Sequence, residues 1–269
     1  MDFLRFTGIV FTLCVSLILP VFAAAFICKR FRLRLLYVLL GALGFIVMQM
    51  LIRIPLLGSA YTQFYLSAMP PIVSIFLLAF TAGLFETGGR YLVFRLFFKN
   101  ERRLVGALGA GIGHGGIEAI ALVGINYCNF IIIGALLLFA PQSALLPALG
   151  ITDAVAAQFC AISPLGFFAA GVERVCAMTL HVFLSVLLFY FMQKKQSLRG
   201  FALVTLIHTV FDFTAQLPRL FVKNADAQLL LAELIVLIGA VICGFFLFRL
   251  AKRWPRDAAP LCTKEDIVN

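Results

Sequence analysis

The sequence predicts an all-α membrane protein that crosses the bilayer about seven times. Of the 269 residues, 63% are hydrophobic and 13% are charged, whereas a soluble domain has roughly 45–50% apolar and about 25% charged residues. A chain this apolar has too few polar residues to cover a surface that faces water. We therefore exclude a soluble enzyme, a disordered protein and a nucleic-acid-binding protein. Seven apolar runs are long enough to cross a hydrocarbon core about 30 Å thick as helices.

The seven runs divide the chain into three parts. In chain order they are Phe6–Cys28, Leu35–Ile52, Pro70–Phe98, Leu104–Phe139, Leu165–Met192, Arg199–Gln216 and Gln228–Leu250. Residues 1–69 hold the first two spans, residues 70–216 a core of four spans, and residues 217–269 the last span and a cytoplasmic tail. The first run is predicted to be a retained helix rather than a signal peptide, because its strong positive charge follows the apolar stretch. The fourth run is long enough to tilt strongly or to break near Asn126–Asn129.

Basic residues alternate between the two ends of these spans. One side holds Lys29, Arg30, Arg32, Arg34, Lys99, Arg102, Arg103, Lys194, Lys195, Arg199, Lys252, Arg253, Arg256 and Lys264, and the other only Arg5, Arg53, Arg219 and Lys223. Positive residues collect on the cytoplasmic side of membrane proteins. The sequence therefore predicts a multi-pass protein of the cell membrane, with its N-terminus outside and its C-terminus in the cytoplasm.

Nine ionisable residues lie well inside the third to sixth predicted spans. They are Glu86, Arg90, His114, Glu118, Glu173, Arg174, His181, His208 and Asp212. A charge at the centre of a membrane helix costs about 2.5–3.5 kcal/mol, so such residues indicate a functional site. Four consecutive spans carry one of them about 9–12 residues from the cytoplasmic end, which corresponds to a depth of roughly 14–18 Å. We expect these side chains to meet in one site.

Spacing within each span supports a shared site. Three pairs are four residues apart and project from one helix face: Glu86–Arg90, His114–Glu118 and His208–Asp212. Glu173 and His181 lie two turns apart on roughly one face, whereas Arg174 should point about 100° away from Glu173 and pair elsewhere or hold a substrate carbonyl. Glu86–Arg90 could equally be a self-neutralised structural pair. Gln49, Asn126 and Asn129 are predicted to form hydrogen bonds between helices, and Glu233 to lie near water without a role.

The charge of this cluster allows two chemistries. Four carboxylates against two arginines leave a charge of −2, which a low-dielectric site does not tolerate. Protons could relieve it, as suits a carboxylate that activates water as a general base. Alternatively, zinc could be held by His114, His181 and His208 with one carboxylate. The HExxH pattern of zinc proteases is absent, because His114-Gly115-Gly116-Ile117-Glu118 has one histidine.

Four motifs in order resemble the YhfC family of intramembrane proteases, which is related to the CAAX-processing and bacteriocin-processing (CPBP) proteases and to the PrsW group. They are Glu86-Thr87-Gly88-Gly89-Arg90, His114-Gly115-Gly116-Ile117-Glu118, Glu173-Arg174 with His181, and His208-Thr209-Val210-Phe211-Asp212. The resemblance spans roughly Gln49 to Pro218. It implies a four-helix catalytic core and hydrolysis of peptide bonds in or beside the membrane. The relatives are described as glutamate-dependent, so the resemblance implies that no cofactor is needed.

The resemblance also implies roles for single residues. Glu86 and Arg90 match the first motif of the family, and Glu118 matches a glutamate of the second. His208 and Asp212 match the last motif, which is expected to polarise the scissile carbonyl and hold the oxyanion. Phe85 stands where CPBP proteases have the leading, water-activating glutamate. The base is therefore Glu86, Glu118 or Glu173, with His114 and His181 orienting the water and Arg174 in support.

The sequence thus favours an intramembrane endopeptidase of the glutamic type that cleaves a membrane-embedded peptide or protein. A zinc-dependent metalloprotease is the alternative within the same class. A proton-coupled transporter, or a non-enzymatic membrane partner, is the alternative from another class. The lipid bilayer and the substrate are the expected partners, and nucleic acid is not. We expect the substrate to enter laterally or through a cavity that faces the cytoplasm.

Overall fold

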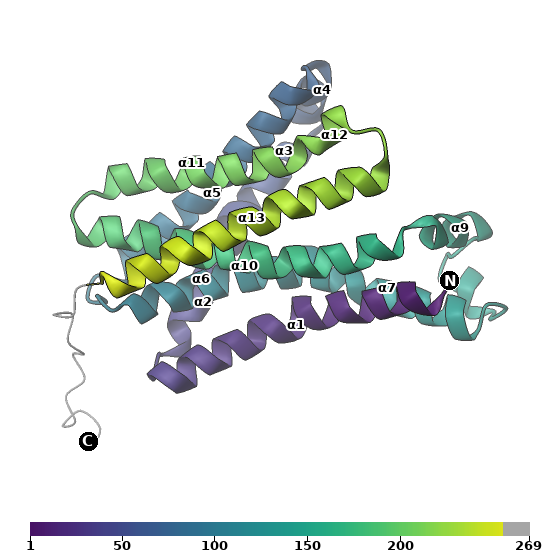
Figure 1. Ribbon diagram of the computed structural model, residues 1–269, viewed down its shortest axis with the longest axis horizontal. Helices are drawn as coiled ribbons and strands as arrows, with labels where there is room; N and C mark the ends of the chain where they lie inside the picture. Colours follow the sequence, from purple (N-terminus) through teal and green to yellow (C-terminus); the bar gives the residue numbers. More distant parts are fainter. Residues whose placement is uncertain (255–269) are drawn as a thin grey trace.

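The computed structural model describes residues 1–254, and these form helices and no strand (Figure 1). Seven helical segments are long and apolar enough to cross a membrane, as predicted. They are α1 (Phe3–Phe31); α2 (Leu35–Phe45) with the π-helical η1 (Ile46–Arg53) and α3 (Ile54–Gly58); α5 (Pro71–Phe97); α6 (Leu104–Glu118) with the π-helical η2 (Ala119–Gly124) and α7 (Ile125–Phe139); α10 (Pro164–Gln193); α11 (Ser197–Gln216) with α12 (Pro218–Phe221); and α13 (Ala225–Lys252). The predicted tail from residue 255 onward lies outside the described residues.

Short helices connect the spans at one end of the bundle. These are α4 (Ala60–Ala68), α8 (Leu145–Ala148) and α9 (Asp153–Ala161). Side-chain caps and prolines fix where the helices begin: Asp2 accepts a hydrogen bond from the Arg5 N–H at the start of α1, and Asn224 does the same for Ala227 in α13. Pro71 and Pro164 open α5 and α10, where a missing N–H costs nothing.

The fourth span does not break near Asn126–Asn129, so of the two expectations for this span, a strong tilt or a break there, the second was wrong. The Asn126 side chain donates a hydrogen bond to the Leu122 carbonyl 2.8 Å away, one turn back in the same helix, and therefore needs no other partner. The irregularity lies earlier, in the π-helical turns of η2, which begin directly after Glu118. A second π-helical segment, η1, interrupts the second span. Such segments are frequent at functional sites.

Helix α10 occupies the middle of the bundle. Over half of its most apolar stretch (56%) is buried inside the protein, against 17–33% for the other spans, and it packs against α1, α6, α11 and α13. Helices α2 and α6 approach each other especially closely. A side chain at Gly41 would overlap the backbone of Ala110, and one at Gly113 would overlap the backbone of Val38. Glycine at both positions permits this contact, which helps to place α6 and its site residues.

The connections gather at two opposite ends. The N-terminus, α4, α9 and α12 lie at one end of the bundle, and the C-terminal end of α13 at the other (Figure 1). The second end carries most of the basic residues and is called the basic end below. There the buried Glu101 accepts hydrogen bonds from the backbone N–H groups of Arg102 and Arg103, and Trp254 Nε1 donates to the Arg102 carbonyl. These bonds fix the loop between α5 and α6.

Candidate active site

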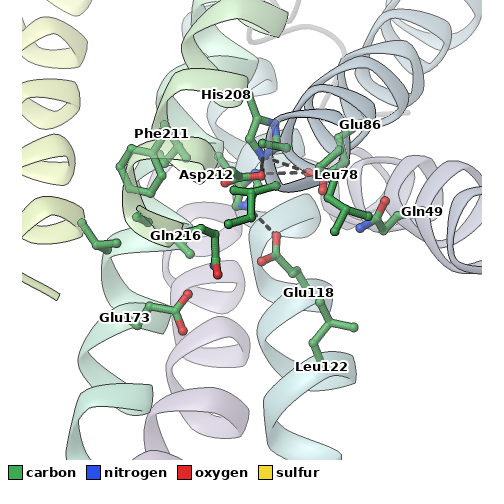
Figure 2. A pocket seen from close by; sticks show the side chains of 18 of the residues that line it. Gln49, Leu78, Glu86, Glu118, Leu122, Glu173, His208, Phe211, Asp212 and Gln216 are labelled. Atoms are coloured by element: carbon green, nitrogen blue, oxygen red, sulfur yellow. Dashed lines mark ion pairs between the residues drawn. The ribbon is translucent and has the colours of Figure 1, made fainter. Parts of the chain in front are cut away.

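The candidate site is centred on the Glu86 carboxylate, in the middle of α5. Its Oε2 atom lies 3.0 Å from His114 Nε2, 3.7 Å from His181 Nδ1 and 3.9 Å from His208 Nε2. The three imidazoles come from α6, α10 and α11, and all four side chains are buried. The structure therefore brings together the four residues that were expected to share one depth. Figure 2 shows Glu86 and His208 side by side among the residues that line a cavity.

Arg90 adds a positive charge to this centre. It lies one turn after Glu86 on α5, and its Nη2 is 3.5 Å from Glu86 Oε2 and hydrogen-bonded to His181 Nδ1. The predicted pairing of Glu86 with Arg90 is present. Because Arg90 also contacts a histidine of α10, it links two helices rather than neutralising Glu86 alone.

His181 connects Glu86 to a second carboxylate. Its Nε2 atom lies 2.5 Å from Glu118 Oε2, while its Nδ1 atom faces Glu86 and Arg90. Glu118 is the last residue of α6, where the π-helical turns of η2 begin. His114 and Glu118 thus both face His181, as their spacing predicted. Their contacts differ: His114 contacts the Glu86 carboxylate, and Glu118 contacts the His181 imidazole.

Arg174 binds the other oxygen of the Glu118 carboxylate. Its Nη1 donates to Glu118 Oε1 at 2.9 Å, and its Nη2 bonds to Glu173 Oε1. Arg174 thus pairs elsewhere, with Glu118, as predicted, but it also contacts Glu173, which was not expected. The two side chains are long enough to meet although their Cα–Cβ bonds diverge around the helix. Glu173 remains about one-third exposed, and it faces the cavity from α10 (Figure 2).

His208 and Asp212 form the predicted pair on α11. His208 Nε2 lies 3.4 Å from Asp212 Oδ2, and Asp212 faces the cavity with about one-third of its side chain exposed (Figure 2). His208 Nε2 therefore lies between two carboxylates, Glu86 and Asp212, and its hydrogen can be donated to either or to a bound group. Its Nδ1 atom is buried without a hydrogen-bond partner among the described residues.

The cavity has a volume of about 510 Å³ and is bounded by residues of η1, α3, α5, α6, η2, α10, α11, α12 and α13. Its deep end is formed by Glu86, His181 and His208. From there it extends to Leu57 of α3, Ile75 near the start of α5 and Arg219 of α12. These residues belong to the end of the bundle that holds α4 and α12 (Figure 1). The cavity does not extend toward the basic end, where tightly packed helices and the Glu101 loop lie. Of the two predicted entry routes, the one through a cavity at that end therefore finds no support, and lateral entry stays a prediction.

Two polar residues of the second span line the cavity and were missed as site residues. Gln49 and Arg53 are buried in η1, and Arg53 Nη1 donates to Gln49 Oε1 at 3.3 Å. Arg53 had been assigned to a loop, because the second span was expected to end at Ile52; the span continues to Gly58. The spacing of four residues between Gln49 and Arg53 was the available signal. With Arg53, three arginines face four carboxylates, so the excess negative charge is one rather than two.

The donor atoms fit a divalent metal ion. One ligand atom each of Glu86, His114 and His181 lie within 4.8 Å of one another, and all three residues are buried. Two imidazoles and one carboxylate are a common protein ligand set for zinc. Glu118 beside the far nitrogen of His181 also resembles the carboxylate that orients a metal-bound histidine. This set contains Glu86 in place of His208, which the sequence had suggested as the third ligand.

Two comparisons with known proteins agree with each other. A family model described as "YhfC intramembrane metalloprotease" matches residues 15–236. The uncharacterized membrane protein YhfC of Bacillus subtilis (strain 168) is 30% identical over 181 residues, which cover 64% of this chain and 66% of that protein, just under two thirds of its length. No solved structure matches the chain.

Proposed function

This chain belongs to the YhfC family of intramembrane metalloproteases, and on that basis we propose that it hydrolyses peptide bonds of a membrane-associated peptide or protein at the Glu86–histidine cluster. One observation supports this function above all: three imidazoles and an arginine surround a single buried carboxylate oxygen at the bottom of a cavity within the membrane-spanning segments. Such a concentration of ionisable groups in a bilayer is costly and is retained where it has a function.

Glu118 is the best-placed general base. Its carboxylate lines the cavity, and Arg174 and His181 hold its two oxygens in place. In hydrolysis, Glu118 takes a proton from water while the water oxygen bonds to the scissile carbonyl carbon. The proton then passes to the amide nitrogen as the carbon–nitrogen bond breaks, leaving a new carboxylate and a new amine.

His208 is placed to stabilise the negative charge that develops on the carbonyl oxygen. Its Nε2 atom faces the cavity 3.4 Å from Asp212 Oδ2, and with a substrate bound its single hydrogen would be donated to the carbonyl oxygen instead of to Asp212. A preorganised donor at this position stabilises the oxyanion in a site that excludes water.

Glu86, His114 and His181 would hold a divalent ion, which when bound would polarise the carbonyl or the attacking water. One contact favours a metal-free version of the same reaction. Arg90 bonds to His181 Nδ1 and lies 3.5 Å from Glu86. Its guanidinium therefore occupies part of the space between the Glu86 and His181 ligand atoms. In that version Arg90 neutralises Glu86, and Glu118 alone activates water, as in a glutamic peptidase.

Hydrolysis can be tested without a known substrate. Purified protein in proteoliposomes is incubated with a pool of synthetic single-span peptides in ¹⁸O-labelled water, and the products are analysed by mass spectrometry. We expect new carboxyl termini that contain ¹⁸O, and a loss of at least about 100-fold in Glu118→Gln. Glu233→Gln is the matched control, because Glu233 is a membrane carboxylate that does not line the cavity. Unchanged cleavage in Glu118→Gln would remove Glu118 from the mechanism, and no cleavage of any peptide by the wild type would contradict the function.

Metal content separates the two versions. We expect about one zinc per chain in wild-type protein purified without chelator, and its loss in His114→Ala. Cleavage by protein that contains no metal would favour the glutamic version. A proton flux that depends on Glu86, in the absence of cleavage, would instead indicate a proton-coupled carrier.

A further inference from the structure

Arg53 has no role in the proposed hydrolysis, yet its side chain is buried in the wall of the same cavity. Its guanidinium is held by three neutral acceptors: the Leu78 carbonyl at 2.6 Å, Thr81 Oγ1 at 3.2 Å and Gln49 Oε1 at 3.3 Å. These contacts fix its position from two helices, η1 and α5. They leave two of its five N–H donors for another group.

The charge of Arg53 distinguishes it from the other two buried arginines of the site. Arg90 pairs with Glu86, and Arg174 pairs with Glu118 and Glu173. Within residues 1–254, Arg53 forms no ion pair, although the more distant Glu86 and Asp212 attract it across the cavity. A buried charge without a directly paired counter-ion is costly. A ligand carboxylate in the cavity would supply that counter-ion.

The surroundings suit an anionic group. Gln49 and Gln216 line the same cavity as Arg53, so amide donors are available in it beside the guanidinium. Arginine binds carboxylates with two parallel hydrogen bonds, which favours it over lysine for such recognition.

The position of Arg53 also defines a distance. Its partners Thr81 and Leu78 precede Glu86 on α5 by five and eight residues, which is about 8–12 Å along the helix. An extended peptide covers about 3.3 Å per residue. A group bound at Arg53 is therefore about two to four residues from a bond placed at Glu86.

We propose that Arg53 and Gln49 form a subsite for a carboxylate of the peptide substrate, about two to four residues from the bond that is cleaved. This inference rests on the proposed function and names its substrate class. The carboxylate is either the C-terminus of the peptide, in which case a fragment of about two to four residues is released, or the side chain of an aspartate or glutamate.

Three synthetic single-span peptides distinguish these sources. They share one sequence and end in a free carboxylate, in an amide, or in an amide preceded by a glutamate three residues from the end. Binding is measured on wild-type protein in nanodiscs, where we expect at least one carboxylate peptide to bind about tenfold or more tightly than the plain amide, as a charge-assisted hydrogen bond would give. Equal affinity for all three peptides would overturn the proposal. This comparison requires no variant and no turnover.

Variants then assign the preference to Arg53. Arg53→Gln should remove it, Arg53→Lys should retain part of it, and Arg219→Gln, which removes an exposed arginine from the same cavity, should leave it unchanged. A preference that persists in folded Arg53→Gln, or that disappears in Arg219→Gln, would overturn the assignment. If a carboxylate peptide binds preferentially but no peptide is cleaved, the proposed hydrolysis fails and the subsite stands. If peptides are cleaved but none binds preferentially, the subsite fails and the proposed hydrolysis stands.

Discussion

Replacing Arg174 by methionine tests whether the chain of charges around Glu118 stabilises the protein. Methionine keeps most of the apolar stem of the arginine but leaves Glu118, of which 12% is exposed, without its guanidinium partner. Removing one partner of a buried ion pair costs about 3–5 kcal/mol. Because His181 still lies 2.5 Å from Glu118, we expect a value near 3 kcal/mol. The ion pair between Arg174 and Glu173 adds little to this cost, since the Glu173 side chain is about one-third exposed.

The double variant Arg174→Met with Glu118→Gln provides the decisive comparison. It removes both charges, so we expect about 1 kcal/mol of destabilisation. The coupling between the two sites is then at least about 2 kcal/mol, and larger by whatever Glu118→Gln costs alone. The assay is reversible unfolding in mixed detergent micelles, with Glu173→Gln in place of Glu118→Gln as the control pair. A cost below about 1 kcal/mol for Arg174→Met alone, or additive effects in the double variant, would refute the reasoning.

Three further predictions concern packing, pH and topology. Gly113→Val should destabilise the protein by about 3 kcal/mol or more in the same unfolding assay, because its side chain would overlap the Val38 backbone, whereas Gly58→Ala has free space and should have little effect. Burial alone would raise the pKa of Glu101, but hydrogen bonds and the charge of Arg103 lower it below its usual 4.5. The stabilisation by Glu101 is therefore complete above that pH and is lost as the pH falls through the lowered pKa, so wild-type stability should decline more steeply than that of Glu101→Gln between about pH 5 and 3. In intact cells, an impermeant thiol reagent should label a cysteine placed at Ser67 and not one placed at Lys99, and the reverse result would invert the predicted orientation.

The spans and the common depth of the site could be predicted from the sequence, because both depend on local composition and helical rise. Apolar runs of sufficient length identify all seven spans, and a rise of about 1.5 Å per residue predicts that Glu86, His114, His181 and His208 lie at one level. Neither inference requires knowledge of how the helices pack.

The partners of the long side chains could not be predicted, because they depend on packing between helices. Arg174 meets both Glu118 and Glu173 since its flexible stem overcomes the divergence of neighbouring Cβ atoms. Arg53 was assigned to a loop because its charge was taken to mark the end of the second span, although the helix continues to Gly58. The direction of the cavity likewise follows from tight packing at the basic end, which no single segment of sequence indicates.

The π-helical segments have a consequence for how the site tolerates changes in chain length. In η1 the N–H of Ile54 donates to the Gln49 carbonyl five residues back, so this part of the span contains more residues per turn than an α-helix does. Deleting a single residue there, such as Met50, would leave a segment that still crosses the bilayer. It would rotate Arg53 by about 100° relative to Leu40 and the rest of α2, enough to turn its charge out of the cavity. Single-residue deletions in η1 should therefore preserve insertion while abolishing the preference for a carboxylate.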